Sequence, residues 1–115
     1  MSAINKLVAA FEAQATRTAF IPELGMKVVA VQVNMEMRAK WMAKAGNSQT
    51  DFTCYSVIHG LTDEDGNEVF SVTDKEALRT KVSPAVVSRL SNFVFGADYG
   101  DEAPEDATEE GREKN

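Results

Sequence analysis

The sequence predicts an α+β fold: a small, mainly helical domain with a β-hairpin near the N-terminal third and a disordered, acidic C-terminal tail. Three observations support this prediction. Apolar residues recur at helical spacing in several segments. A valine-rich, alternating run lies at residues 26–33. Residues 96–115 carry eight acidic and two basic side chains but no large aliphatic residue. We therefore expect one folded domain over residues 1–96 and a tail over residues 97–115.

Length and charge limit the classes of function. A chain of 115 residues has room for a single domain with a modest core. Residues 1–95 carry ten acidic and ten basic side chains, so this neutral body lacks the basic patch that nucleic-acid binding needs. No apolar run approaches the roughly 20 residues of a membrane span, and no secretory signal is evident. The single cysteine, Cys54, cannot form an internal disulfide, which favours a reducing cytoplasm.

The first helix is predicted from an N-cap at Ser2 and a stripe of apolar residues at i, i+3, i+4 and i+7. This apolar stripe consists of Ile4, Leu7, Val8 and Phe11. We expect the helix to dock on its own core. The alternative is an arm that docks on a neighbouring subunit, because terminal helices are often loosely held.

A β-hairpin is expected between Thr18 and Val33, around the turn Pro22-Glu23-Leu24-Gly25. In its second strand, residues 29, 31 and 33 are all valine and form a fully apolar face. Residues 28, 30 and 32 form a partly polar face. The density of β-branched residues indicates that this strand is well buried.

A second helix is predicted from Met35 to Ala45, with Asn34 as its cap and Gly46 at its end. It is also the predicted partner-binding element. Tryptophan is the natural anchor of such a surface, methionine gives adaptable contacts, and basic residues set salt dependence. Tryptophan in the core remains the more frequent outcome. The candidate partner-binding residues are Met37, Arg38, Trp41, Met42 and Lys44.

Residues 48–61 have strand-like composition, yet Cys54, Ile58 and Leu61 recur at helical spacing and Ser48 can cap a helix. We predict a helix, with a strand as the alternative. An acidic turn at residues 63–67 follows, in which glycine takes a positive φ freely.

Two further helix starts follow this turn. Thr73 and Glu76 are spaced as a capping box, and Ser83 precedes Pro84 as an N-cap precedes a proline at the first helical position. Gly96 is placed to end the last helix. The apolar face of that helix comprises Val86, Val87, Leu90, Phe93 and Val94.

No catalytic, cofactor or metal site is predicted. His59 is the only histidine, and Cys54 lies in an apolar run where burial raises a thiol pKa. The acidic turn does not fit a calcium-binding loop, because its glycine would make Leu61 the first ligand. A small enzyme built on Cys54 and His59 is thus the weakest of the functional hypotheses.

The order of motifs resembles one known family. An Ile-Pro-Glu-x-Gly turn precedes a valine-rich strand and a polar helix. Then come Gly-Leu-x-Asp-Glu-Asp-Gly-Asn-Glu-Val-Phe, a Thr-Asp helix start, a last helix and a charged tail. Together these features resemble the tail assembly chaperones of long-tailed bacteriophages with flexible, noncontractile tails, the lambda-like siphoviruses. The resemblance covers Ile21 to Phe95 and is sharpest from Leu61 to Leu78.

This resemblance implies a non-catalytic assembly factor without cofactors, acting in the host cytoplasm and absent from the mature virion. It implies binding to the tape measure protein and recruitment of major tail tube subunits around it. Many members are also made in a longer, frameshifted form. It implies neither nucleic-acid nor membrane binding.

Self-association follows from this role, because a chaperone that tracks a long filament must repeat along it. We expect a head-to-tail homo-oligomer that uses the first helix and the helix from Met35 to Ala45. The alternative function is a small acidic inhibitor, a nucleic-acid mimic acting on a host enzyme, which the acidic tail suggests.

Overall fold

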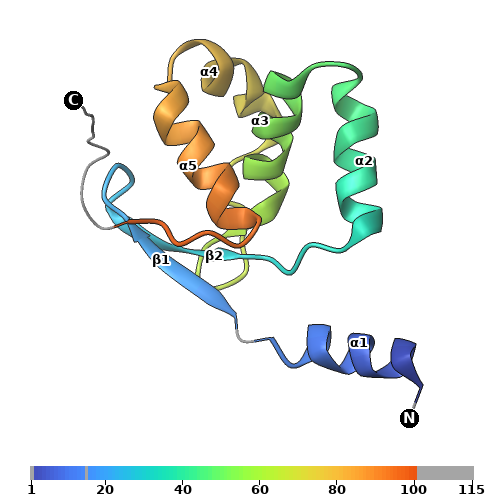
Figure 1. Cartoon of the computed structure of the whole chain (residues 1–115). Coiled ribbons are helices and arrows are strands. Elements are labelled where there is room, and N and C mark those ends of the chain that lie inside the picture. Colours follow the sequence, from blue (N-terminus) through green and yellow to red (C-terminus); the bar gives the residue numbers. More distant parts are fainter. Residues whose placement is uncertain (1, 15, 101–115) are drawn as a thin grey trace, which may run out of the picture.

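The structure is a computed structural model that describes residues 2–14 and 16–100. Its sheet has three antiparallel strands in the order β1 (Arg17–Ile21), β2 (Met26–Ala30) and β3 (Leu61–Thr62). The helices other than α1 form a cluster on one side of this sheet (Figure 1), and α3 contacts β3, so the predicted α+β class is confirmed. The helices are α1 (Ala3–Glu12), α2 (Met35–Ala45), α3 (Gln49–Gly60), the 3₁₀ helix η1 (Val72–Asp74), α4 (Lys75–Thr80) and α5 (Pro84–Val94). Within the described ranges, none of them is long and apolar enough to cross a membrane.

The predicted hairpin is confirmed. Strands β1 and β2 pair from Arg17 opposite Ala30 to Ile21 opposite Met26. Gly25 closes the turn at φ +68°, a conformation that a residue with a Cβ adopts only with strain. The predicted fully apolar face is not the more buried one. Val28 and Ala30 are buried, whereas residues 29, 31 and 33 are only half-buried, because β2 presents its even-numbered residues to the core.

Helix α3 occupies the centre of the domain and packs against α2, α4, α5 and β3. The helix predicted at residues 48–61 is therefore confirmed, and the Ser48 hydroxyl accepts a hydrogen bond from the Asp51 N–H at 3.0 Å. The Ser56 and Ser91 hydroxyls are 2.7 Å apart and join α3 to α5 inside the core. At the end of α3, a Cβ on Gly60 would lie only 2.5 Å from a methyl carbon of Val94. Glycine is thus required where α3 meets α5.

The acidic turn forms as expected. The Asp63 carboxylate accepts hydrogen bonds from the N–H groups of Asp65 and Asn67, each at 2.9 Å, and Gly66 has φ +88°. The residues directly before this turn form the short strand β3, which was not predicted from the sequence. Thr62 pairs with Val29 of β2 and bridges to Glu68.

The predicted capping box at Thr73 and Glu76 is wrong. The box lies two residues earlier, where the Asp74 carboxylate accepts a hydrogen bond from the Ser71 N–H at 2.8 Å. The reason is that a 3₁₀ turn precedes α4, which shifts the capped position toward the N-terminus. Glu76 instead pairs with Arg79 at 2.9 Å.

Helix α5 begins at Pro84 as expected, although the Ser83 side chain makes no capping hydrogen bond. Val86 is half-buried and the other four apolar residues predicted for its face are buried. Gly96, at φ +119°, follows the end of the helix.

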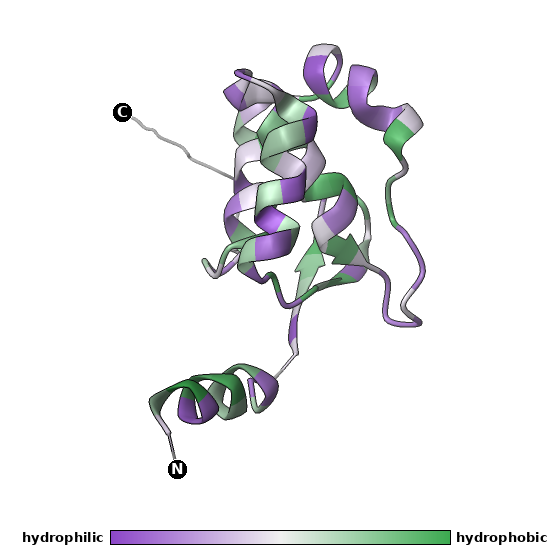
Figure 2. Ribbon diagram, turned by 90° about the vertical axis from the view of Figure 1, so that its right-hand side faces the viewer, coloured by the Kyte–Doolittle hydropathy of each residue, from purple (hydrophilic) through white to green (hydrophobic). Residues whose placement is uncertain are grey.

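Helix α1 does not dock on its own core, so that expectation is wrong. Ser2 caps the helix as predicted, at 3.2 Å from the Asn5 N–H, but α1 buries no residue. Ile4, Leu7 and Val8 are 63%, 68% and 46% exposed. Figures 1 and 2 show the helix standing away from the body, with its hydrophobic residues along one side. The buried core of the domain contains no residue of this helix.

The packed part of the chain continues past the predicted boundary at residue 96. Tyr99 is only 6% exposed, its hydroxyl donates a 2.9 Å hydrogen bond to Glu23, and its ring lies 4.1 Å from the Arg89 guanidinium carbon. The expected disorder is therefore wrong for residues 97–100, because one aromatic ring supplies enough apolar area to hold them. The rest of the predicted tail, residues 101–115, lies outside the described residues.

A pair of truncations tests this boundary. A chain that ends at Gly100 should keep the thermal midpoint of the full protein, because residues 101–115 contain no large apolar side chain. A chain that ends at Gly96 loses the Tyr99 contacts and should lose about 2 kcal/mol of unfolding free energy, seen as a midpoint several degrees lower. Equal midpoints for the two truncations would contradict this account.

Candidate partner-binding surfaces

Trp41, the predicted anchor of a partner surface, lies in the core and is 5% exposed. Its ring stacks on the His59 ring at a centroid distance of 6.3 Å and meets the Phe95 ring edge-on at 6.2 Å. Helix α2 projects this residue toward α3 and the end of α5. Trp41 therefore joins three elements and presents almost no area to a partner.

Arg38 and Met42 are exposed on one side of Trp41. They border a hollow of about 240 Å³ between the end of α2 and the start of α3, which we call the α2–α3 hollow. Phe52 of α3 also borders it and is half-buried, so the hollow offers apolar area beside a cation. Its full lining is Arg38, Met42, Ala45, Gly46, Asn47, Ser48, Gln49 and Phe52.

Lys44 lies elsewhere. Its ammonium is 5.7 Å from the centre of the Tyr55 ring and 3.3 Å from Nε2 of His59, so it is directed along α3. Met37 is half-buried and packs against the core. The structure thus brings Arg38 and Met42 together at one hollow, and it places Lys44 and Met37 apart from that hollow.

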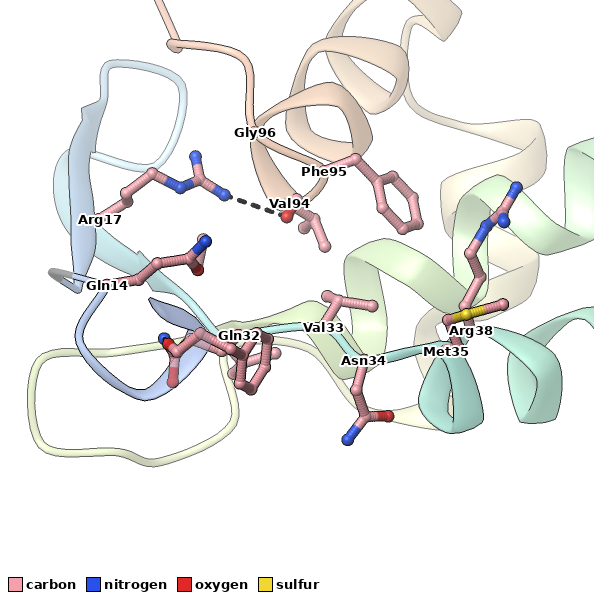
Figure 3. Close-up of a pocket in the computed structure, with 13 residues that line it drawn as sticks. Gln14, Arg17, Gln32, Val33, Asn34, Met35, Arg38, Val94, Phe95 and Gly96 are labelled. Atoms are coloured by element: carbon pink, nitrogen blue, oxygen red, sulfur yellow. Dashed lines mark hydrogen bonds between the residues drawn. The ribbon is translucent and has the colours of Figure 1, made fainter. Parts of the chain in front are cut away.

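A second surface was not predicted from the sequence. A groove of about 600 Å³ lies where α1, the β2–α2 connection and the end of α5 meet (Figure 3). Arg17 and Arg38 lie on opposite sides of it, and we call it the Arg17–Arg38 groove. Its lining contains no acidic residue: Phe11, Gln14, Arg17, Ala30, Val31, Gln32, Val33, Asn34, Met35, Arg38, Val94, Phe95 and Gly96.

Arg17 is held at this groove by α5. Its Nη2 donates a 3.0 Å hydrogen bond to the Val94 carbonyl, and its guanidinium lies 4.9 Å from the Phe93 ring centre. Its Nη1 is buried without a hydrogen-bond partner among the described residues. Because Arg17 and Val94 are 77 residues apart in the chain, no local pattern could have revealed this contact.

The groove and the hollow adjoin each other and have exposed apolar residues at their borders. Met35 is 85% exposed at the start of α2, and Phe95 is exposed at the end of α5. The Phe95 ring stacks on the Phe52 ring at 5.9 Å, which links the two depressions, and Arg38 borders both. Contiguous exposed apolar area of this kind is typical of protein-binding surfaces.

Cys54 and His59 are poorly placed for catalysis. Cys54 is buried, and this burial, reinforced by the Asp51 carboxylate, raises the pKa of its thiol, which disfavours the reactive thiolate. Burial and the nearby Lys44 ammonium lower the pKa of His59, whose ring lies between those of Trp41 and Tyr55. Among the described residues, no cluster of three histidine, cysteine or acidic side chains could hold a metal ion.

Comparison with known proteins gives a similarity to a solved structure. No protein-family model and no curated protein matches the chain. Among solved structures, the chain is similar to "Structure of bacteriophage HK97 tail assembly chaperone". The identity is 29%, over 81% of this chain and 95% of that chain, with a TM-score of 0.49.

The buried position of Trp41 gives a first prediction for these surfaces. Trp41→Ala should lower the unfolding free energy by about 3–5 kcal/mol, because it leaves a large cavity between α2, α3 and α5. Met42→Ala, at a half-exposed position on the same helix, is the matched control and should cost less than about 1 kcal/mol. Urea denaturation measures both. A Trp41→Ala chain as stable as the control would place Trp41 outside the core.

The surroundings of His59 predict a pH dependence of stability. Because its folded-state pKa is lowered, the unfolded chain takes up a proton first as the pH falls. Stability should therefore be full above the unfolded pKa of about 6.5 and decline as the pH falls through that value toward the lowered pKa. His59→Phe keeps a ring between Trp41 and Tyr55 but cannot titrate. Urea midpoints at pH 7.5 and 5.5 should differ more for the natural chain than for His59→Phe, and an equal difference would refute the assignment.

Proposed function

We propose that this protein is a bacteriophage tail assembly chaperone that binds the tape measure protein and recruits tail tube subunits around it. The observation that carries the proposal is the order of motifs from Ile21 to Phe95, which resembles that of the family. The solved chain to which this protein is similar bears the same name, tail assembly chaperone. We further propose that it acts in the host cytoplasm and is absent from the mature virion.

The α2–α3 hollow supports binding of an apolar-striped helix. A tape measure protein is an extended helix that would aggregate unaided, and covering it requires an adaptable apolar surface. Met42 is flexible and half-exposed, and Phe52 offers a flat ring beside it. Two apolar anchors at the rim of a hollow suit the apolar residues that recur every three or four positions along a partner helix.

Arg38 adds an electrostatic component to this surface. Its guanidinium borders the hollow and makes no side-chain hydrogen bond or ion pair within the described part of the chain. An exposed cation of this kind attracts acidic residues on a partner and mainly changes the association rate. Binding through the hollow should therefore weaken as ionic strength rises.

We propose a non-catalytic role. A small enzyme built on Cys54 and His59 would need an accessible thiolate, and the buried Cys54 thiol with its raised pKa works against that. The acidic inhibitor is the second candidate. It is favoured only by the charge of residues 96–115, because residues 1–95 carry no net charge from which to shape a mimic of nucleic acid.

The expected homo-oligomer and a frameshifted longer form are part of the same proposal. A protein of 115 residues can cover a long filament only by repeating along it, which favours head-to-tail contacts.

Substitutions at the hollow test tape measure binding. Met42→Glu should abolish capture of a tape measure fragment, because it places a charge against an apolar partner. Arg38→Ser should slow association at low salt and leave the fold intact, since an exposed charge contributes only about 0–1 kcal/mol. Biolayer interferometry with an immobilised tape measure helix at two salt concentrations measures both effects.

Lys44→Ser is the matched control, because it removes a cation from the same helix but away from the hollow. Capture should survive in this variant. If Lys44→Ser weakens capture as much as Arg38→Ser does, the binding surface lies on the other side of α2. Undiminished capture by Met42→Glu would exclude the hollow.

A further inference from the structure

Helix α1 carries an apolar stripe that nothing in the described part of the chain covers. Its three exposed apolar residues, Ile4, Leu7 and Val8, fall at i, i+3 and i+4 and so lie on one side of the helix. Figure 2 shows that hydrophobic residues gather on one side of this helix. A ten-residue helix is too short to be stable in water alone, so it needs a packing partner for this stripe.

The Arg17–Arg38 groove on the same chain has the complementary properties. Val33 and Phe95 provide an apolar floor, and Met35 stands 85% exposed at the rim. Both of its charged residues are arginines. One chain thus presents an uncovered apolar helix and an uncovered apolar groove.

The two surfaces do not meet within one chain. The Gln32 side-chain amide donates a 2.6 Å hydrogen bond to the Phe11 carbonyl and holds the C-terminal end of α1 at the edge of the groove. From this point the helix runs outward, away from the body (Figure 1). Only Phe11, its last apolar residue, reaches the groove lining.

We propose that α1 of one copy docks its apolar stripe in the Arg17–Arg38 groove of a second copy. This proposal specifies the contact behind the homo-oligomer proposed above and rests on that part of the proposed function. The contact is heterologous, because it joins two different surfaces. A row of copies therefore keeps a free α1 at one end and a free groove at the other, so the row can grow or close into a ring.

Charge is consistent with this occupant. The last residue of α1 is Glu12, and the carbonyl groups of the final turn make that end of a helix negative. The groove meets this end with arginines. Arg38 is exposed and can be reached by an incoming carboxylate, whereas Arg17 is already held by the Val94 carbonyl.

The size of α1 sets the strength of the contact. A ten-residue helix is about 15 Å long. It therefore buries much less than the ~800 Å² per partner that stable interfaces bury. We expect a weak, concentration-dependent association, one that a shared filament would strengthen by holding neighbouring copies close together.

The test uses one variant for each surface. Leu7→Glu places a charge in the apolar stripe, and Met35→Glu places one at the rim of the groove. Both positions are exposed in the single chain, so neither change should unfold it. Each variant should raise the self-association constant Kd by roughly 30-fold or more, measured by sedimentation velocity over a wide range of concentrations.

Mixing the two variants gives the decisive result. The Leu7→Glu chain keeps an intact groove, and the Met35→Glu chain keeps an intact α1. An equimolar mixture should therefore form dimers and nothing larger, although each variant alone is monomeric. Ala9→Glu and Lys40→Glu introduce the same group at exposed positions outside the stripe and the groove, and both should associate like the natural chain.

Several outcomes would overturn the proposal. These are a natural chain that stays monomeric at millimolar concentration, a mixture of the two variants that stays monomeric, or a Leu7→Glu chain that associates normally.

Capture of a tape measure helix by the monomeric variants separates this proposal from the proposed function. If capture persists in monomers that no longer associate, both stand. If the natural chain associates but does not capture the tape measure helix, only the chaperone role fails.

Discussion

The close contact between α3 and α5 is the constraint on which the other elements depend. Gly60 lets the end of α3 approach Val94 to a distance that a side chain would prevent, and the Ser56 and Ser91 hydroxyls satisfy each other inside the same interface. Because these two helices are fixed, the Trp41 ring packs between His59 of α3 and Phe95 at the end of α5, and this contact positions α2. The approach also sets where α5 ends, and hence where Val94 offers its carbonyl to Arg17.

Ion pairs tie α4 to this central pair of helices. Asp51 of α3 lies 3.2 Å from both Lys75 and Arg79, and the Lys75 ammonium lies 5.0 Å from the centre of the Tyr55 ring. These groups are partly exposed, so each pair contributes little to stability. Their contribution is to orientation, because they fix a six-residue helix that buries only Leu78.

The sequence predicted those features that local rules govern. The extents of α2 and α3, the glycine turns and the apolar face of α5 follow from caps, φ preferences and periodicity within a few residues. Features that depend on distant contacts could not be predicted. Strand β3 has two residues and exists only because β2 lies beside it, and Arg17 is held at the groove by Val94, which is distant in the sequence. Likewise, the periodicity of α1 indicated an apolar face but not what covers it.

The hydrogen bond between Tyr99 and Glu23 has a practical consequence for labelling the protein. It anchors the chain beside the turn between β1 and β2, so that a fluorophore or affinity tag joined directly after Gly100 would begin there. Helix α1 lies at the other end of the sheet (Figure 1). A reporter placed after Gly100 would thus leave both the helix and the groove accessible, whereas one fused ahead of Ser2 would crowd the exposed stripe.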